Sequence, residues 1–94
     1  MIIAEIEEAT GNKTASKLAN EFGPGRAMFV KMDVGDEEDV KRLKQAALAE
    51  FGKVDIILNN ATIFPMDSVE DVPITAWDKS YHVNLRGPVL LALA

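Results

Sequence analysis

Three short apolar runs, each followed by a longer amphipathic stretch, constrain the fold of this 94-residue chain more than any other feature. Residues 1–6, 27–32 and 54–58 are rich in Ile, Val, Leu, Met and Phe, which is typical of strands covered on both faces. The stretches between these runs carry apolar residues at helical spacing and are long enough to act as crossover connections. This order predicts an α/β fold with a doubly wound parallel sheet, or part of one, in which three strands alternate with three helices.

Residues that begin or stop helices mark the boundaries of the three predicted helices. The first helix is predicted between residues 7 and 22, because the sequence Gly-Pro-Gly at residues 23–25 stops it. Asp36 is the predicted N-cap of the second helix, and Gly52 follows its end. Thr75 is predicted to cap a third helix that runs to the end of the chain. The buried stripe of the second helix is predicted to comprise Val40, Leu43, Ala47 and Phe51.

Composition and charge exclude several classes of protein. Hydrophobic residues make up 48% and charged residues 27% of the chain, which is the balance of a folded globular protein. A net charge of -5 without a cluster of Lys and Arg argues against nucleic-acid binding. The chain has no cysteine and only one histidine, so no metal site is expected. With neither a signal peptide nor a membrane span at its start, we expect a cytoplasmic protein that does not enter a membrane.

The residues that end the first two strands are candidates for ligand binding, because ligands of open α/β sheets sit beyond the carboxyl ends of the strands. The Glu5 carboxylate can accept hydrogen bonds from the adenosine ribose hydroxyls of a dinucleotide and would repel a 2′-phosphate, which favours NAD over NADP. A solvated charge beside Glu7 and Glu8 is an equally good interpretation. Asp33 can accept from an adenine amino group while the backbone N–H of Val34 donates to the ring, although turn formation explains a strand-ending Asp about as often.

The third strand leads into two side-chain amides, Asn59 and Asn60, followed by the small residue Ala61 and by Thr62. The small residue would let a cofactor approach the backbone closely. Turn formation is the alternative interpretation of either Asn.

Together with the sequence YHVNLRGP at residues 81–88, these motifs occur in one known family. On LNNAT after VDII, and on DV after the preceding strand, the chain resembles the short-chain dehydrogenase/reductase family over nearly all of its length. The resemblance implies a Rossmann-type NAD(P)-binding domain, of which residues 1–94 would be one incomplete part. It implies cofactor contacts from Glu5, Ile6, Asp33, Val34, Asn60, Ala61 and Thr62. Thr62 stands where the family has Gly. The sequence therefore departs from the family at a position where a close backbone contact is usual.

The resemblance assigns Asn84 to the Asn of the family's catalytic tetrad, which holds a water in the proton relay. A feature of the residues supports this role: Pro88, four residues later, has no N–H to donate to the Asn84 carbonyl. The freed carbonyl needs another partner, so we expect a kink in which it binds a water. A simple kink whose carbonyl faces solvent is the alternative. Tyr81 and His82 are interpreted as packing and surface positions rather than catalytic ones.

Two signatures of the family do not occur in this chain. The glycine-rich TGxxxGxG turn that holds the cofactor pyrophosphate is missing, because GPGR at residues 23–26 follows a helix instead of a strand. Tyr81 is followed four residues later by Leu85, so the YxxxK pair of the proton donor is missing as well. The resemblance implies hydride transfer between NAD(H) and an alcohol or carbonyl substrate in a longer parent protein, whereas the 94-residue chain is predicted to be inactive.

The sheet order of the family, 3-2-1-4, implies that the first strand would lie between two of the strands predicted here. Two strand edges would then be open to pairing with another chain. We therefore expect a homo-oligomer, a strand-exchanged dimer, or a rearranged sheet in which residues 1–6 pair with residues 54–59. Two other interpretations of the chain stay open: it is a noncatalytic module that acts by association, or it is a gene fragment without a selected role.

Overall fold

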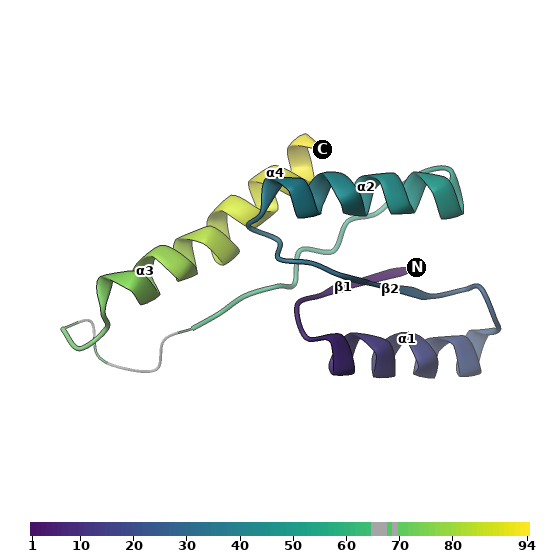
Figure 1. Ribbon diagram of the computed structural model, residues 1–94, viewed down its shortest axis with the longest axis horizontal. Coiled ribbons are helices and arrows are strands. Elements are labelled where there is room, and N and C mark those ends of the chain that lie inside the picture. The colour runs from purple at the N-terminus through teal and green to yellow at the C-terminus, as the bar shows by residue number, and fades with distance from the viewer. Residues whose placement is uncertain (65–67, 69) are drawn as a thin grey trace.

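A computed structural model describes residues 1–64, 68 and 70–94 of the chain (Figure 1). In chain order its elements are β1 (Ile2–Glu5), α1 (Glu8–Phe22), β2 (Met28–Lys31), α2 (Glu37–Phe51), α3 (Ile74–Tyr81), the π turn η1 (His82–Arg86) and α4 (Gly87–Leu93). The last three elements follow one another directly and are called the carboxyl-terminal rod below.

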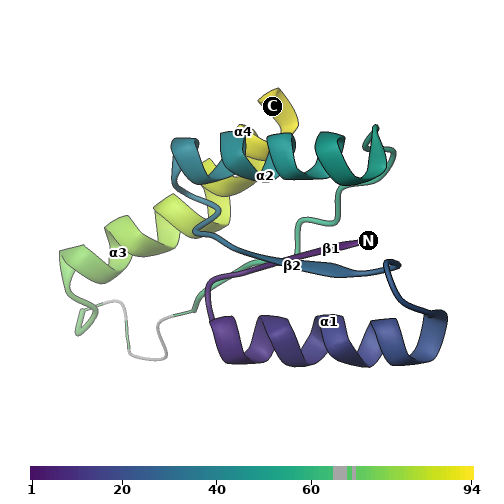
Figure 2. The same cartoon turned by 45° about the vertical axis from the view of Figure 1, so that its right-hand side comes forward.

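A two-stranded parallel sheet joins β1 to β2 through the crossover helix α1. The register pairs Ile2 with Met28 and Glu5 with Lys31. In both views α1 lies on one side of the strands, and α2 lies on the other side together with α4 (Figures 1 and 2). The predicted α/β class with parallel strands is therefore confirmed.

Close packing between α1 and the sheet depends on Gly11. It is the buried residue of α1, and a Cβ placed there would lie 2.1 Å from Cε2 of Phe29 in β2. A glycine inside a helix costs about 1 kcal/mol relative to alanine. The absent side chain makes room for the aromatic ring. Gly11, although a weak helix former, is therefore required where α1 contacts β2.

The two ends of α2 form as the sequence predicts. The Asp36 carboxylate accepts a hydrogen bond from the Asp39 backbone N–H at 3.0 Å, which satisfies one of the free donors of the first turn. Gly52 ends the helix with φ +77°, a left-handed conformation that glycine adopts without strain. Its N–H donates to the Leu48 carbonyl at 2.9 Å.

The hydrophobic core of the described residues is small. Its buried apolar residues are Met32, Val40 and Ala47. The predicted buried stripe of α2 is correct for Val40 and Ala47, but wrong for Phe51, which is 38% exposed. The radius of gyration is 15.0 Å, whereas a compact domain of this length has about 12 Å. The chain is thus more extended than a closed domain, and much apolar surface stays in contact with solvent.

The third predicted strand does not form, so the expected three-strand sheet is wrong for this chain. Residues 52–64 have no regular secondary structure, and Ile56 and Leu58 are each 86% exposed. Among the described residues the sheet contains β1 and β2 alone, so the expected pairing of residues 1–6 with residues 54–59 is also wrong. A strand is held by backbone hydrogen bonds to a neighbouring strand, and an apolar sequence without such a neighbour stays irregular.

The carboxyl-terminal rod begins two residues earlier than the sequence predicts. Pro73, not Thr75, is the N-cap, and its carbonyl accepts from the backbone N–H of Ala76 at 2.9 Å. The rod changes from α to π geometry where the Gly87 N–H donates to the His82 carbonyl, five residues back. In the part of the chain that is described, no helix has both the length and the apolar character needed to cross a membrane.

The contact between Gly11 and Phe29 predicts an unusual response to substitution. Gly11→Ala is expected to lower the free energy of unfolding by about 1–2 kcal/mol through overpacking, although alanine is the better helix former. Urea denaturation followed by far-UV circular dichroism measures the change, with Asn12→Ala on the exposed face of α1 as the control. A Gly11→Ala protein more stable than the parent would contradict the close packing of α1 on β2.

Candidate functional site

The carboxyl ends of β1 and β2 bring four of the predicted site residues to one edge of the sheet. Glu5 ends β1, and its carbonyl accepts from the Met32 N–H at 3.1 Å. The two strands therefore end at the same level of the sheet. Ile6 and Asp33 line one open hollow at this edge. Val34 follows Asp33 directly. The prediction that the ends of neighbouring strands meet is therefore correct for these two strands.

The Glu5 carboxylate is held by the backbone at the start of α1. Its Oε1 accepts from the N–H groups of Ile6 at 3.1 Å and Glu7 at 3.2 Å. No hydrogen bond to Oε2 is found within the described ranges, so that oxygen can accept from a ligand. Glu5 is thus oriented by its own turn, and both of these hydrogen bonds are exposed to solvent.

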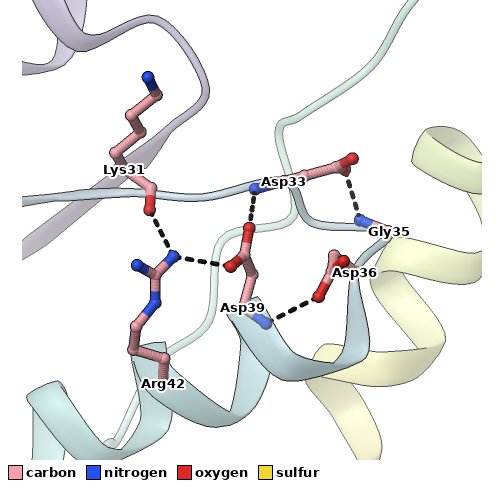
Figure 3. Close-up of polar contacts among 6 residues, drawn as sticks. All are labelled: Lys31, Asp33, Gly35, Asp36, Asp39 and Arg42. Atoms are coloured by element: carbon pink, nitrogen blue, oxygen red, sulfur yellow. Dashed lines mark hydrogen bonds and ion pairs between the residues drawn. The ribbon is translucent and has the colours of Figure 1, made fainter.

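The backbone of Asp33 is fixed by side chains from α2 (Figure 3). The Asp33 N–H donates to Oδ2 of Asp39 at 2.9 Å. Oδ1 of the same carboxylate accepts from Nη2 of Arg42 at 2.7 Å, and this nitrogen also donates to the Lys31 carbonyl at 2.9 Å. The end of β2 is therefore anchored to α2 by one carboxylate and one guanidinium.

This anchoring role of Asp39 and Arg42 is not among the roles that the sequence pattern predicts. Asp39 is an expected first-turn acid of α2, a position that suits the helix dipole. The spacing of three residues from Asp39 to Arg42 indicates an ion pair on a helix. Nothing in that spacing indicates that the pair reaches back to the strand.

The Asp33 side chain bridges the turn after β2 and the carboxyl-terminal rod. Its Oδ1 accepts from the Gly35 N–H at 2.9 Å, so the turn-forming interpretation of this residue is correct (Figure 3). Its Oδ2 lies 3.3 Å from Nε2 of His82. A carboxylate oxygen can accept more than one hydrogen bond, so turn formation leaves capacity for a ligand.

The turn at residues 33–35, called the Asp33 turn below, makes further contacts with the rod. Nε of Arg86 donates to the Gly35 carbonyl at 3.0 Å. Gly87 approaches Val34 so closely that a Cβ on Gly87 would lie 2.8 Å from Cγ2 of Val34. The Asp33 turn is therefore held from two sides, by α2 and by the rod.

The side chain of Asn84 holds the second candidate loop, residues 60–63, in place. Its Oδ1 accepts from the Ile63 N–H at 2.8 Å and from the Thr62 hydroxyl at 3.0 Å, and its Nδ2 donates to the Ile63 carbonyl at 2.8 Å. The structure thus brings Thr62 to Asn84, whereas Asn60 and Ala61 stay exposed. The bond from the Thr62 hydroxyl is one that a glycine could not make.

The irregular segment of the rod coincides with the sequence feature that predicts it. The π turn covers His82–Arg86 and contains Asn84. It lies directly before Gly87 and Pro88, where the missing N–H of the proline breaks the regular bonding pattern. π turns inside helices are frequent at functional sites. A water at the Asn84 carbonyl stays a prediction.

Comparisons with known proteins agree with this arrangement. The family model for short chain dehydrogenases matches residues 1–94. A trans-4-hydroxycyclohexanecarboxylate dehydrogenase of Sinomonas cyclohexanicum is 38% identical over an alignment of length 94 that covers 96% of this chain and 36% of that protein. A solved short-chain dehydrogenase from Novosphingobium aromaticivorans superimposes with a TM-score of 0.89 at 29% identity, covering 98% of this chain and 34% of that structure.

A second solved structure is a 3-ketoacyl-(acyl-carrier-protein) reductase from Brucella melitensis complexed with NADH. It superimposes with a TM-score of 0.85 at 30% identity, covering 97% of this chain and 36% of that structure. The chain therefore spans about a third of the length of the relatives that it matches. Because the family model matches every residue from 1 to 94 and the solved relatives share the parallel α/β arrangement, this chain belongs to the short-chain dehydrogenase family and has part of its Rossmann-type fold.

Proposed function

We propose that this chain is the part of an NAD(H)-dependent oxidoreductase that binds the adenosine half of the cofactor and supports its proton relay. The parent protein would transfer hydride between the cofactor and an alcohol or carbonyl substrate in the cytoplasm. The observation that carries the proposal is the meeting of Glu5 and Asp33 at one sheet edge, with Asn84 in the rod that contacts the same edge. Membership of the family supports the general oxidoreductase chemistry.

The chemistry of the donors and acceptors at this edge fits an adenosine. Oε2 of Glu5 would accept from the ribose hydroxyls, and the Asp33 carboxylate would accept from the adenine amino group. The Val34 N–H would donate to the ring, and Ile6 would supply an apolar wall. Glu5, with Glu7 and Glu8 close by in the sequence, would repel a 2′-phosphate, so NAD is proposed over NADP.

The second loop is proposed to support the cofactor beyond the adenosine. Asn60 and Ala61 would line its path with exposed backbone, and Thr62 would be held there by Asn84. The side chain of Asn84 is occupied by Ile63 and Thr62, so its backbone carbonyl is the group proposed to hold the relay water. The cofactor supplies the hydride chemistry when bound. Residues 1–94 contain no YxxxK pair, so we expect no hydride transfer from this chain alone.

The preference for NAD can be tested on the adenosine half. We expect adenosine 2′,5′-bisphosphate to bind at least about tenfold more weakly than adenosine 5′-monophosphate, because the 2′-phosphate lies beside Glu5. In Glu5→Gln the difference should shrink to about threefold or less. NMR titration of the ¹⁵N-labelled chain measures both affinities, and Glu21→Gln at the far end of α1 is the control. Equal binding of the two nucleotides by the parent chain would refute the assignment of Glu5.

The role of Asn84 can be tested without a ligand. Asn84→Ala removes both bonds to Ile63, so the Ile63 amide should exchange with solvent about tenfold faster or more. Asn84→Asp keeps the acceptor for the Ile63 N–H but places a carboxylate against the Ile63 carbonyl, and it should give an intermediate rate. Hydrogen exchange followed by NMR makes the measurement, with Asn12→Ala as the control. An unchanged Ile63 rate in Asn84→Ala would show that the rod does not hold this loop.

A second candidate function is self-association, favoured by the exposed apolar segment at residues 54–58. Ile56 and Leu58 are each 86% exposed, and β1 has a strand neighbour on one side alone within the described chain. An open strand edge and exposed apolar side chains each favour pairing with a second copy. This would account for a homo-oligomer.

Sedimentation velocity tests the association. We expect the parent chain to sediment as a dimer or larger species, and Leu58→Asp to shift it towards monomer by weakening association about tenfold or more. Lys53→Gln, at an exposed position just before the segment, should leave the distribution unchanged. A parent chain that is monomeric at high concentration would exclude this function.

A further inference from the structure

His82 occupies a position that ties it to the proposed nucleotide site although it does not belong to the sheet. Its Nε2 lies 3.3 Å from Oδ2 of Asp33, across 49 residues of sequence. The His82 side chain is 40% exposed and that of Asp33 is 36% exposed, so the pair sits at the rim where a ligand can reach the carboxylate.

The Asp33 turn is shaped to receive the imidazole. A Cβ on Gly35 would lie 2.1 Å from Cδ2 and 2.3 Å from Nε2 of His82. The ring therefore rests where any other residue at position 35 would place its side chain. Arg86 fixes the same backbone by donating to the Gly35 carbonyl at 3.0 Å. His82 is thus seated against the turn and cannot be regarded as a freely moving surface side chain.

The two oxygens of Asp33 are held by different partners. Oδ1 accepts from the Gly35 N–H at 2.9 Å, and Oδ2 faces His82. A neutral imidazole with its proton on Nε2 donates to Oδ2 and uses one of its lone pairs. The carboxylate is then prevented from rotating, and its remaining lone pairs keep a fixed direction at the rim.

A carboxylate in a fixed direction distinguishes purines by their substituent at position 6. Adenine presents an amino group there, which donates to the carboxylate, whereas hypoxanthine presents a carbonyl oxygen, which the carboxylate repels. A carboxylate that can rotate would turn away from the carbonyl and lose much of this discrimination.

We propose that His82 is a positioning residue that orients Asp33 so that the nucleotide site selects 6-amino purines over 6-oxo purines. This inference rests on the proposed function, because it assumes that Asp33 faces a nucleobase. His82 itself does not touch the ligand; it acts through its hydrogen bond to Oδ2.

The test compares adenosine 5′-monophosphate with inosine 5′-monophosphate by NMR titration of the 94-residue chain. The 94-residue chain without substitutions, called the parent chain here, should bind the adenine nucleotide at least about tenfold more tightly than the inosine nucleotide. His82→Phe keeps a ring but removes the donor, and the preference should fall to about twofold or less. His82→Gln places an amide donor near the position of Nε2 and should retain most of it. Lys79→Gln, at an exposed position of α3, is the matched control.

Each result decides between distinct conclusions. A preference that survives in His82→Phe, or that is lost in His82→Gln as fully as in His82→Phe, overturns the positioning role while the proposed function stands. Binding of neither nucleotide by the parent chain overturns the proposed function and this inference with it.

One measurement needs no variant and covers the case in which a variant fails to fold. ¹⁵N NMR of the parent chain in mildly alkaline buffer reports which imidazole nitrogen carries the proton. We expect the Nε2–H tautomer to dominate, and the Nδ1–H population to rise in Asp33→Asn. A dominant Nδ1–H tautomer in the parent chain would leave Oδ2 without a donor and would overturn the proposal.

Discussion

The contact of the carboxyl-terminal rod with two separate loops is the constraint on which the site depends. His82 and Arg86 are four residues apart, so they lie on one face of the helix, where both reach the Asp33 turn. Asn84 lies between them and points to a different side, where it holds Ile63. A single turn of the rod therefore fixes the distance between the end of β2 and the loop after residue 58. No strand in the described part of the chain joins these two regions, and the rod takes over that task.

Features that arise from neighbouring residues could be predicted from the sequence. The N-cap at Asp36 and the left-handed Gly52 need only the residues of one helix end, and both are present. The first two strands form because β1 and β2 are each other's partners across α1. The third strand has an equally apolar sequence, but its formation depends on a strand that must lie beside it. The predicted cap at Thr75 is wrong, because Pro73, whose ring fixes φ at −66°, is the N-cap and Thr75 lies inside the helix.

The candidate site likewise has features that could be predicted from the sequence and features that depend on distant residues. That Glu5 and Asp33 lie at the carboxyl ends of neighbouring strands follows from the order of the elements, and the break in the rod follows from Pro88. The partners of these residues come from far along the chain: His82 is 49 residues from Asp33, and Asn84 is 21 residues from Ile63. Such pairs depend on how the rod crosses the sheet, and no spacing in the sequence encodes that crossing.

The polar contacts at the rim fix the positions of the site residues and contribute little to the stability of the fold. Pairs such as Arg42 with Asp39 are partly exposed, and exposed ion pairs contribute about 0–1 kcal/mol each. The buried core is also small, so the rod and the sheet are joined by few strong interactions. A ligand that contacts both the Asp33 turn and the loop held by Asn84 binds only when rod and sheet are docked, and it stabilises that arrangement by mass action. Its affinity is in turn reduced by the fraction of molecules in which they are apart. If this ligand is the cofactor, as the proposed function requires, its binding and the docking of the rod are coupled equilibria.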